Sequence, residues 1–230
     1  MIITIDGPSA TGKSTIAKKL AKAIGYIYYD TGAMYRAVAL ETLRKGIALT
    51  DAPALQKFLD GFEFRIKMFR GERRYYIGDE DITDKIRTEE VSQYASKVSA
   101  IAAIRDKMLK IQRDHALGVN AVFEGRDMGT TVFPEADLKI FLTGKSDVRA
   151  KRRFDEMKAK FPEDASHYTI EKILSDLIER DQFDMTREAS PLKKADDAFE
   201  IDTSNLSPDE IVFKILECKD IASARRKKKG

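Results

Sequence analysis

Residues 7–14 have the types and the spacing that bind a polyphosphate. They read Gly-Pro-Ser-Ala-Thr-Gly-Lys-Ser and fit the pattern G-x-x-x-x-G-K-[ST] without a mismatch. In such a loop the glycines let the backbone wrap a phosphate with its N–H groups pointing inward, and the following helix adds its positive N-terminal end. Lys13 reaches the outer phosphates, and Ser14 offers a hydroxyl to Mg²⁺. We therefore predict a nucleoside triphosphate site made of one continuous stretch: Gly7, Pro8, Ser9, Ala10, Thr11, Gly12, Lys13, Ser14 and Thr15.

The alternative interpretation is a glycine-rich turn that fits the pattern by chance. An apolar run from Ile2 to Ile5 precedes the loop, and a helical stripe over residues 16–24 follows it. This order of strand, loop and helix is the context that the pattern requires, so it favours phosphate binding.

Two further segments have side chains that suit a second phosphate. Thr31 and Arg36 lie at the start of a helix pattern, for which the alternative is a helix start with one exposed arginine. In residues 123–130 a strand pattern runs into a charged, glycine-flanked turn, where Arg126 and Asp127 meet a ligand unless they pair with each other. Guanidinium groups bind phosphate bidentately and stay charged, so both arginines are candidates for holding an acceptor phosphate.

A third group of charges lies on two helices late in the chain. It consists of Arg149, Arg152 and Arg153, which partly share a helix face, and of Arg180, Asp181, Asp184 and Arg187. A solvated helix surface is the usual reason for such charges. Phosphoryl transfer gives another reason, because it needs two substrates held in line and the charge of the moving group neutralised. No Ser-His-Asp or Cys-His set competes for a catalytic role.

Strand and helix patterns alternate along most of the chain and must position these groups. Short apolar runs predict five strands, at residues 2–5, 26–29, 120–123, 138–142 and 199–201. Strands that alternate with helices imply a parallel sheet covered on both faces. Ligands of such sheets lie beyond the carboxyl ends of the strands, where the phosphate loop and the turn after residue 123 are expected.

One stretch departs from this order. Residues 62–68 alternate apolar and polar side chains, and residues 75–77 form a return strand. This pattern predicts a small antiparallel insert outside the main sheet. Farther on, Ser207, Pro208 and Glu210 predict the start of a helix.

Composition limits the class of protein. The chain has 230 residues, of which 43% are hydrophobic, and no apolar run long enough to span a membrane. Residues 225–229 contribute five positive charges, so the net charge of +3 becomes −2 without them. A solvated terminus is our interpretation of this basic tail, with nucleic-acid binding as the alternative. One cysteine, Cys218, excludes an internal disulfide, and we expect a cytoplasmic protein without a structural metal.

Four segments together resemble the bacterial-type cytidylate kinases, a family of P-loop nucleoside monophosphate kinases. They are IDGPSATGKST at the start, YDTGAMYRA at 29–37, EGRDMGTTVFPEADLKIFL at 124–142 and RDQFDMTREASPL at 180–192. The resemblance covers most of the chain in the order and spacing of the family. It implies an α/β fold with a P-loop NTPase-type core, a parallel five-stranded sheet flanked by helices, a small antiparallel insert in a monophosphate-binding lobe, and a short lid.

The resemblance also implies a domain organisation. One kinase domain would span 1–222, with a core at about 1–33, 99–148 and 168–222, a monophosphate-binding lobe at about 34–98 with its insert at 62–78, and a lid at about 149–167. The basic tail, 223–230, has no counterpart in the family pattern.

The implied reaction is transfer of the γ-phosphate of ATP, with Mg²⁺, to CMP or dCMP. By position, the resemblance assigns catalytic roles to Lys13, Arg126, Arg153 and Arg187, the metal contact to Ser14, and ATP contacts to the phosphate loop and Arg149. It assigns the acceptor phosphate to Arg36, Arg126 and Arg187, the walls of that site to Thr31 and Tyr35, the cytosine edge to Ser96, Arg105 and Asp127, and the sugar to Arg180 and Asp184.

Two rival functions remain open at this level. The first is a kinase for another nucleoside monophosphate such as UMP. The second is a nucleotide-dependent switch or a nucleic-acid-associated ATPase, although the chain lacks the D-x-x-G and N-K-x-D signatures of GTPase switches. We expect a monomer with small-molecule substrates and neither a membrane nor a nucleic-acid partner.

Overall fold

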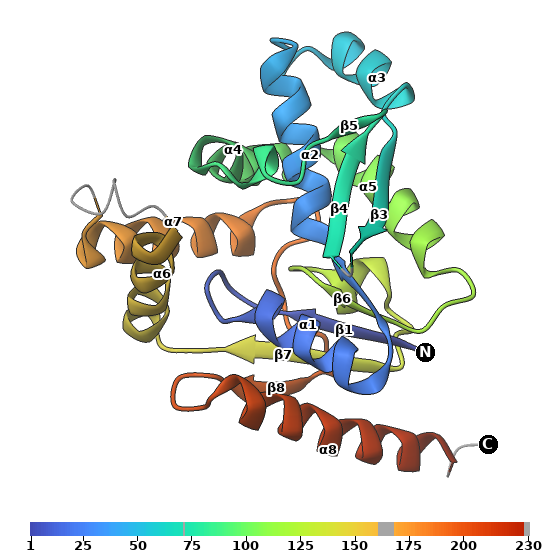
Figure 1. The fold of residues 1–230 in the computed structure, drawn as a ribbon, viewed down its shortest axis with the longest axis vertical. Helices are drawn as coiled ribbons and strands as arrows, with labels where there is room; N and C mark the ends of the chain where they lie inside the picture. Colours follow the sequence, from blue (N-terminus) through green and yellow to red (C-terminus); the bar gives the residue numbers. More distant parts are fainter. Residues whose placement is uncertain (71, 161–167, 228–230) are drawn as a thin grey trace. The chain divides into compact units, whose positions relative to one another are not determined.

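The computed structural model describes residues 1–70, 72–160 and 168–227. The chain forms two compact units, one made of Met1–Tyr29 with Ala116–Gly230 and one made of Asp30–His115. Figure 1 shows their helices and strands.

The first unit is built on a five-stranded sheet with the strand order β2-β6-β1-β7-β8. Its strands are β1 (Ile2–Asp6), β2 (Ile27–Asp30), β6 (Ala121–Glu124), β7 (Leu138–Thr143) and β8 (Phe199–Asp202). β1 runs parallel to both β6 and β7, and β7 runs parallel to β8. The predicted parallel sheet is therefore confirmed, with β1 at its centre and the phosphate loop directly after it.

Apolar stripes hold two helices, α1 (Lys13–Ile24) and α8 (Pro208–Lys227), against this sheet. The two helices also pack on each other, as Figure 1 shows. Ile5 of β1, Leu20 of α1 and Ile215 of α8 are fully buried in the shared core. The predicted start of α8 is confirmed, because the Ser207 N–H donates to the Glu210 carboxylate while the Ser207 hydroxyl accepts the Glu210 N–H.

Two more helices of this unit, α6 (Ser146–Lys160) and α7 (Ile170–Thr186), pack against each other. Their contact buries Ala150, Met157, Ile173 and Leu177. Of the lid predicted at 149–167, residues 161–167 lie outside the described residues. Of the basic tail, 225–227 continue α8, and 228–230 lie outside the described residues.

The second unit begins with α2 (Thr31–Arg44), which is capped by Asp30 through its side chain and the Ala33 N–H at 2.9 Å. The remaining elements are α3 (Ala52–Asp60), β3 (Phe64–Phe69), β4 (Glu72–Ile77), β5 (Glu80–Asp81), η1 (Lys85–Arg87), α4 (Glu89–Val98) and α5 (Ala102–Ala116). The antiparallel insert is confirmed and has a third, short strand, since the sheet order is β3-β4-β5. Its apolar face packs Phe64 on Tyr75, with ring centroids 5.8 Å apart.

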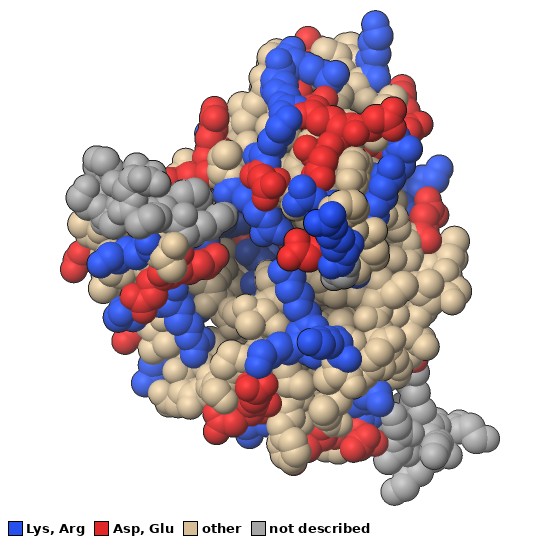
Figure 2. Space-filling view, in the orientation of Figure 1, with Lys and Arg blue, Asp and Glu red and all other residues tan. Residues whose placement is uncertain are grey.

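Charges of both signs are spread over the surface. The chain has 41 Lys and Arg and 38 Asp and Glu residues, and the two kinds are interspersed on the face drawn in Figure 2. Within the described part of the chain, no helix has the length and apolar character needed to cross a membrane.

Candidate active site

The phosphate loop joins β1 to α1 in a backbone shape that its glycines permit. Gly7 and Gly12 have φ of 146° and 87°. A Cβ on Gly7 would lie 2.1 Å from the carbonyl oxygen of Leu142 in β7, so only glycine fits there. The Lys13 ammonium donates to the Pro8 carbonyl at 2.5 Å and to the Thr11 hydroxyl at 3.4 Å, which places it inside the loop.

The electrostatics of Lys13 favour an anion in this loop. Lys13 is only 6% exposed, and burial lowers the pKa of its ammonium well below the ordinary value, with the positive charge of Arg126 acting in the same direction. Glu124 and Asp181 oppose this shift. Two cations near each other in a buried place are stabilised by a bound anion, and the inward N–H groups of a phosphate loop suit a polyphosphate.

The donor set near the loop also fits a magnesium ion held mainly by phosphate oxygens. Ser14, in the first turn of α1, has an exposed side chain and offers one hard oxygen ligand. Among the described residues, no group of three or more His, Cys, Asp or Glu side chains is arranged to hold a metal ion. Magnesium usually keeps several waters and takes one or two protein ligands plus substrate phosphates, so a single hydroxyl is compatible with it.

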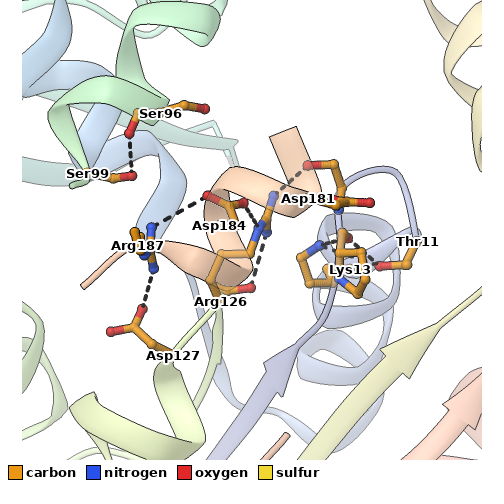
Figure 3. Close-up of polar contacts among 12 residues, drawn as sticks. Thr11, Lys13, Ser96, Ser99, Arg126, Asp127, Asp181, Asp184 and Arg187 are labelled. Atoms are coloured by element: carbon orange, nitrogen blue, oxygen red, sulfur yellow. Dashed lines mark hydrogen bonds and ion pairs between the residues drawn. The ribbon is translucent and has the colours of Figure 1, made fainter. Parts of the chain in front are cut away.

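The turn after β6 supplies an arginine that contacts the loop. The Arg126 guanidinium donates to the Asp184 carboxylate at 2.9 Å and to the Ser9 hydroxyl at 3.0 Å. Arg187 lies 3.6 Å from Asp184 and 3.9 Å from Asp127. Figure 3 shows Arg126 and Asp127, from the turn after β6, close to Asp184 and Arg187, from the C-terminal end of α7. The structure thus brings together five of the predicted site residues, Ser9, Arg126, Asp127, Asp184 and Arg187.

This cluster keeps its carboxylate ionised. Burial alone would raise the pKa of Asp184, but the positive charges of Arg126, Arg180 and Arg187 outweigh it and hold the pKa below the ordinary value. Arg187 is fixed further by two hydrogen bonds to the Ser190 carbonyl, at 2.9 and 2.7 Å. The arrangement is a set of guanidinium groups around the Asp184 carboxylate, and it can present positive charge to a phosphate.

The three arginines of α6 lie in different surroundings. Arg149 is buried and pairs with Asp181 at 2.5 Å. Arg152 donates to the Thr203 carbonyl at 2.6 Å, and Arg153 pairs with Glu156 at 3.2 Å with 38% of its side chain exposed.

The remaining predicted residues lie in the second unit. Arg36 pairs with Asp30 at 2.9 Å, one turn into α2, where Thr31 and Tyr35 are buried. Burial acts to raise the pKa of Asp30, yet Arg36 and the Ala33 N–H lower it below the ordinary value. Asp30 was not predicted as the partner of Arg36, although an aspartate directly before a helix is a capping signal.

Two predicted cytosine readers also lie in this unit. Arg105 donates to the Ser99 carbonyl at 2.9 Å and lies over the Tyr35 ring, 5.6 Å from its centroid. The carbonyl of Ser96 accepts a hydrogen bond from the Ser99 hydroxyl at 2.8 Å. Ser96 and Arg105 therefore both bond to Ser99, which follows the last residue of α4. The structure groups these residues within their unit.

Comparison with known proteins places the chain in a family. The family model described as cytidylate kinase matches residues 3–220. A cytidylate kinase of Protochlamydia amoebophila is 59% identical, over 98% of this chain and 99% of its own length. A cytidylate kinase of Caldicellulosiruptor saccharolyticus is 46% identical, over 94% of this chain and 93% of its own length.

Among solved structures, a gluconokinase from Sinorhizobium meliloti is similar in fold, with a TM-score of 0.52 at 15% identity over 99% of this chain and 97% of that one. At that identity the likeness concerns the fold alone. The family model and the curated relatives span nearly the whole chain, and the chain therefore belongs to the cytidylate kinase family.

Proposed function

We propose that this chain transfers the γ-phosphoryl group of ATP to CMP or dCMP, which yields ADP and the nucleoside diphosphate. The observation that carries the proposal is the hydrogen bond between the Arg126 guanidinium and the Ser9 hydroxyl, at 3.0 Å. Through it, an arginine assigned to the acceptor phosphate lies against the loop assigned to the donor phosphates. A phosphoryl group moving between the two would remain next to positive charge throughout.

At the donor end, the backbone N–H groups of the phosphate loop and the Lys13 ammonium bind the phosphates of ATP. Ser14 would contribute its hydroxyl to Mg²⁺, which would offset the negative charge of the phosphates. Burial lowers the pKa of the Lys13 ammonium, and this supports the role, since nearby phosphate oxygens would stabilise its positive charge.

At the acceptor end, Arg36, Arg126 and Arg187 hold the monophosphate, and Thr31 and Tyr35 line its site. Arg180 and Asp184 bind the sugar. The pairing chemistry supports Ser96, Arg105 and Asp127 as the groups that read the base, because cytosine offers an amino donor at N4 and acceptors at N3 and O2. An aspartate accepts from N4, whereas an arginine and a serine donate to the acceptors.

The transfer itself asks for positioning and charge stabilisation rather than covalent catalysis. Asp184 contacts Arg126 at 2.9 Å and Arg187 at 3.6 Å, and these contacts orient both guanidinium groups. The ion pair of Arg153 with Glu156 is more exposed than that of Arg149 with Asp181, and this supports Arg153 as the arginine that contacts the transferred group. A lid at about 149–167 would exclude water and suppress hydrolysis of ATP.

The test is an ADP-release assay with ATP and Mg²⁺, run with CMP, dCMP, UMP, AMP, GMP and no acceptor. We expect turnover mainly with CMP and dCMP. Dominant turnover with UMP would favour the rival assignment to another monophosphate. ADP release that ignores every acceptor would overturn the proposal in favour of an ATPase.

The base-reading assignment has its own variant. Asp127→Ala removes the acceptor for the cytosine amino group, so we expect the KM for CMP to rise more than about tenfold while the KM for ATP changes by less than about threefold. Equal changes in both constants would remove Asp127 from base recognition and leave the kinase assignment in place.

A further inference from the structure

Ser9 bonds through all three of its polar groups to segments outside the phosphate loop. Its N–H donates to the Asp181 carboxylate at 2.9 Å, and its carbonyl accepts from Arg149 at 2.9 Å. Its hydroxyl accepts from Arg126 at 3.0 Å. Ser9 is 5% exposed, so these bonds are sheltered from water. One loop residue is therefore tied to α7, to α6 and to the turn after β6.

The bonds to the Ser9 backbone belong to a buried ion pair. Asp181 and Arg149 lie 2.5 Å apart, with 6% and 8% of their side chains exposed. Arg149 also donates to the Gly144 carbonyl at 3.0 Å. A buried pair with further hydrogen bonds to the Gly144 carbonyl and to the Ser9 backbone has one favoured geometry, so it fixes the position of the Ser9 peptide groups.

The bond to the Ser9 hydroxyl leads to the acceptor-side cluster. Arg126 donates to Asp184, and Asp184 lies three residues after Asp181 on the same helix. Residues with this spacing lie on one face of a helix. One face of α7 therefore contacts the phosphate loop through Asp181 and the acceptor arginines through Asp184.

We propose that Ser9 couples binding of the donor triphosphate to binding of the acceptor monophosphate. The ion pair fixes the Ser9 peptide groups, whereas the Ser9 hydroxyl can still rotate about the Cα–Cβ bond. A triphosphate bound in the loop holds that hydroxyl in one rotamer, and with it the guanidinium of Arg126 that meets the acceptor phosphate. By thermodynamic reciprocity, a bound acceptor raises the affinity for the triphosphate by the same factor. This inference rests on the proposed function, because it needs two nucleotide sites on these residues.

The test compares affinities for CMP, measured by calorimetry, with and without a non-hydrolysable ATP analogue and Mg²⁺. The ratio of the two dissociation constants is the coupling factor, for which we expect about 5 to 150 in the wild type. Ser9→Ala removes only the hydroxyl acceptor and leaves both backbone bonds possible. We expect its coupling factor to fall at least about fivefold, while the affinity for CMP alone changes less.

Thr11→Val is the matched control, because Thr11 also has a loop hydroxyl but donates it to the Pro8 carbonyl inside the loop, at 3.0 Å. We expect it to alter the affinity for the ATP analogue and to leave the coupling factor at the wild-type value. Asp181→Asn is the second variant, and it serves if Ser9→Ala does not fold. It keeps an acceptor for the Ser9 N–H but loses the ion pair with Arg149, so we expect reduced coupling as well.

The outcomes separate this inference from the proposed function. A wild-type coupling factor of one, or Ser9→Ala and Asp181→Asn proteins that both keep the wild-type factor, would overturn the inference even where CMP is phosphorylated. A wild-type chain that neither binds nor phosphorylates CMP would overturn the proposed function instead.

Discussion

At the scale of single residues, Asp6 connects the end of β1 with the turn that carries Arg126 and Asp127. Its carboxylate accepts the N–H groups of Met128 and Gly129 at 2.9 and 2.8 Å. Burial raises its pKa to about 7, against the lowering effect of those two hydrogen bonds, and the charge of Asp127 raises it further while Lys13 lowers it. Asp6 thus binds a proton more tightly in the folded chain than in the unfolded one.

The sign of the resulting pH dependence follows from linkage. Between about pH 4 and pH 7 the folded state holds a proton on Asp6 that the unfolded state has lost, so this group makes the free energy of unfolding fall as the pH rises. We expect the ligand-free wild type to lose about 3 kcal/mol more than Asp6→Asn between pH 4.5 and pH 7.5. Urea unfolding of both proteins at the two pH values measures the difference. Parallel pH profiles would contradict the assignment.

The sequence predicted the chemistry of individual residues better than their partners. Arg126, Asp127 and Arg187 stood out because charges in a glycine-flanked turn, or at regular helical spacing, suit a phosphate. Asp181 belongs to the same group of charges but has no assigned role, because one aspartate on a charged helix looks the same in sequence whether it faces water or a buried loop peptide. Only the packing of α6 on α7, close to the loop, gives it the Ser9 contact.

At the scale of elements, the phosphate loop depends on its close approach to β7. A Cβ at Gly7 would meet backbone atoms of Leu142, and the φ of 146° is a conformation that side chains disfavour. We expect Gly7→Ala to lower the free energy of unfolding by about 3 kcal/mol or more and to abolish ATP binding, because strand and loop cannot both keep their positions. Urea unfolding and binding of an ATP analogue test this.

Gly12→Ala is the control for the steric part of that effect. Its Cβ would meet no atom within 4 Å, and only the φ of 87° is unfavourable. We expect a loss of about 1–2 kcal/mol, the cost of a left-handed backbone alone. Equal losses in the two variants would mean that the contact with Leu142 is not what selects glycine at position 7.

Regular elements were predictable where one periodicity dominates. All five strands of the main sheet and the antiparallel insert follow from apolar runs and alternation. Helix α3 was not predicted, although Asp51 accepts the Ala54 N–H at 3.0 Å and a proline lies in its first turn, which are readable start signals. The five-residue π-helical turn η2 (Met128–Val132) has no sequence signature, since tertiary contacts such as those of Asp6 impose it.

At the scale of the whole molecule, the division into two units leaves little trace in the sequence. The first boundary falls inside β2 and the second at the end of α5, so no glycine- or proline-rich linker separates the units. A boundary within continuous elements produces no shift in composition. The domain limits expected from the family resemblance, with a lobe at about 34–98 and a lid at about 149–167, therefore remain predictions.

The charge of the whole chain leads to a last prediction, on residues 225–230. These residues include five positive charges, and without them the net charge falls from +3 to −2. Every predicted site residue precedes residue 188. The α8 residues that pack in the core, from Ile211 to Ala222, also precede residue 225. We expect deletion of 225–230 to leave kcat and KM for CMP within about twofold of the full chain, because the segment contains none of the predicted site residues.

The same deletion tests the rival nucleic-acid function. We expect single-stranded RNA to bind the full chain only weakly, and its affinity to fall as the salt concentration rises. The reason is that the attraction comes from counterion release by a few lysines and arginines. Titrations at two salt concentrations, with both chains, measure this together with the kinase assay. Tight RNA binding at physiological salt that disappears with 225–230, or a tenfold loss of CMP phosphorylation, would show that the tail takes part in function, because a merely solvated terminus changes neither.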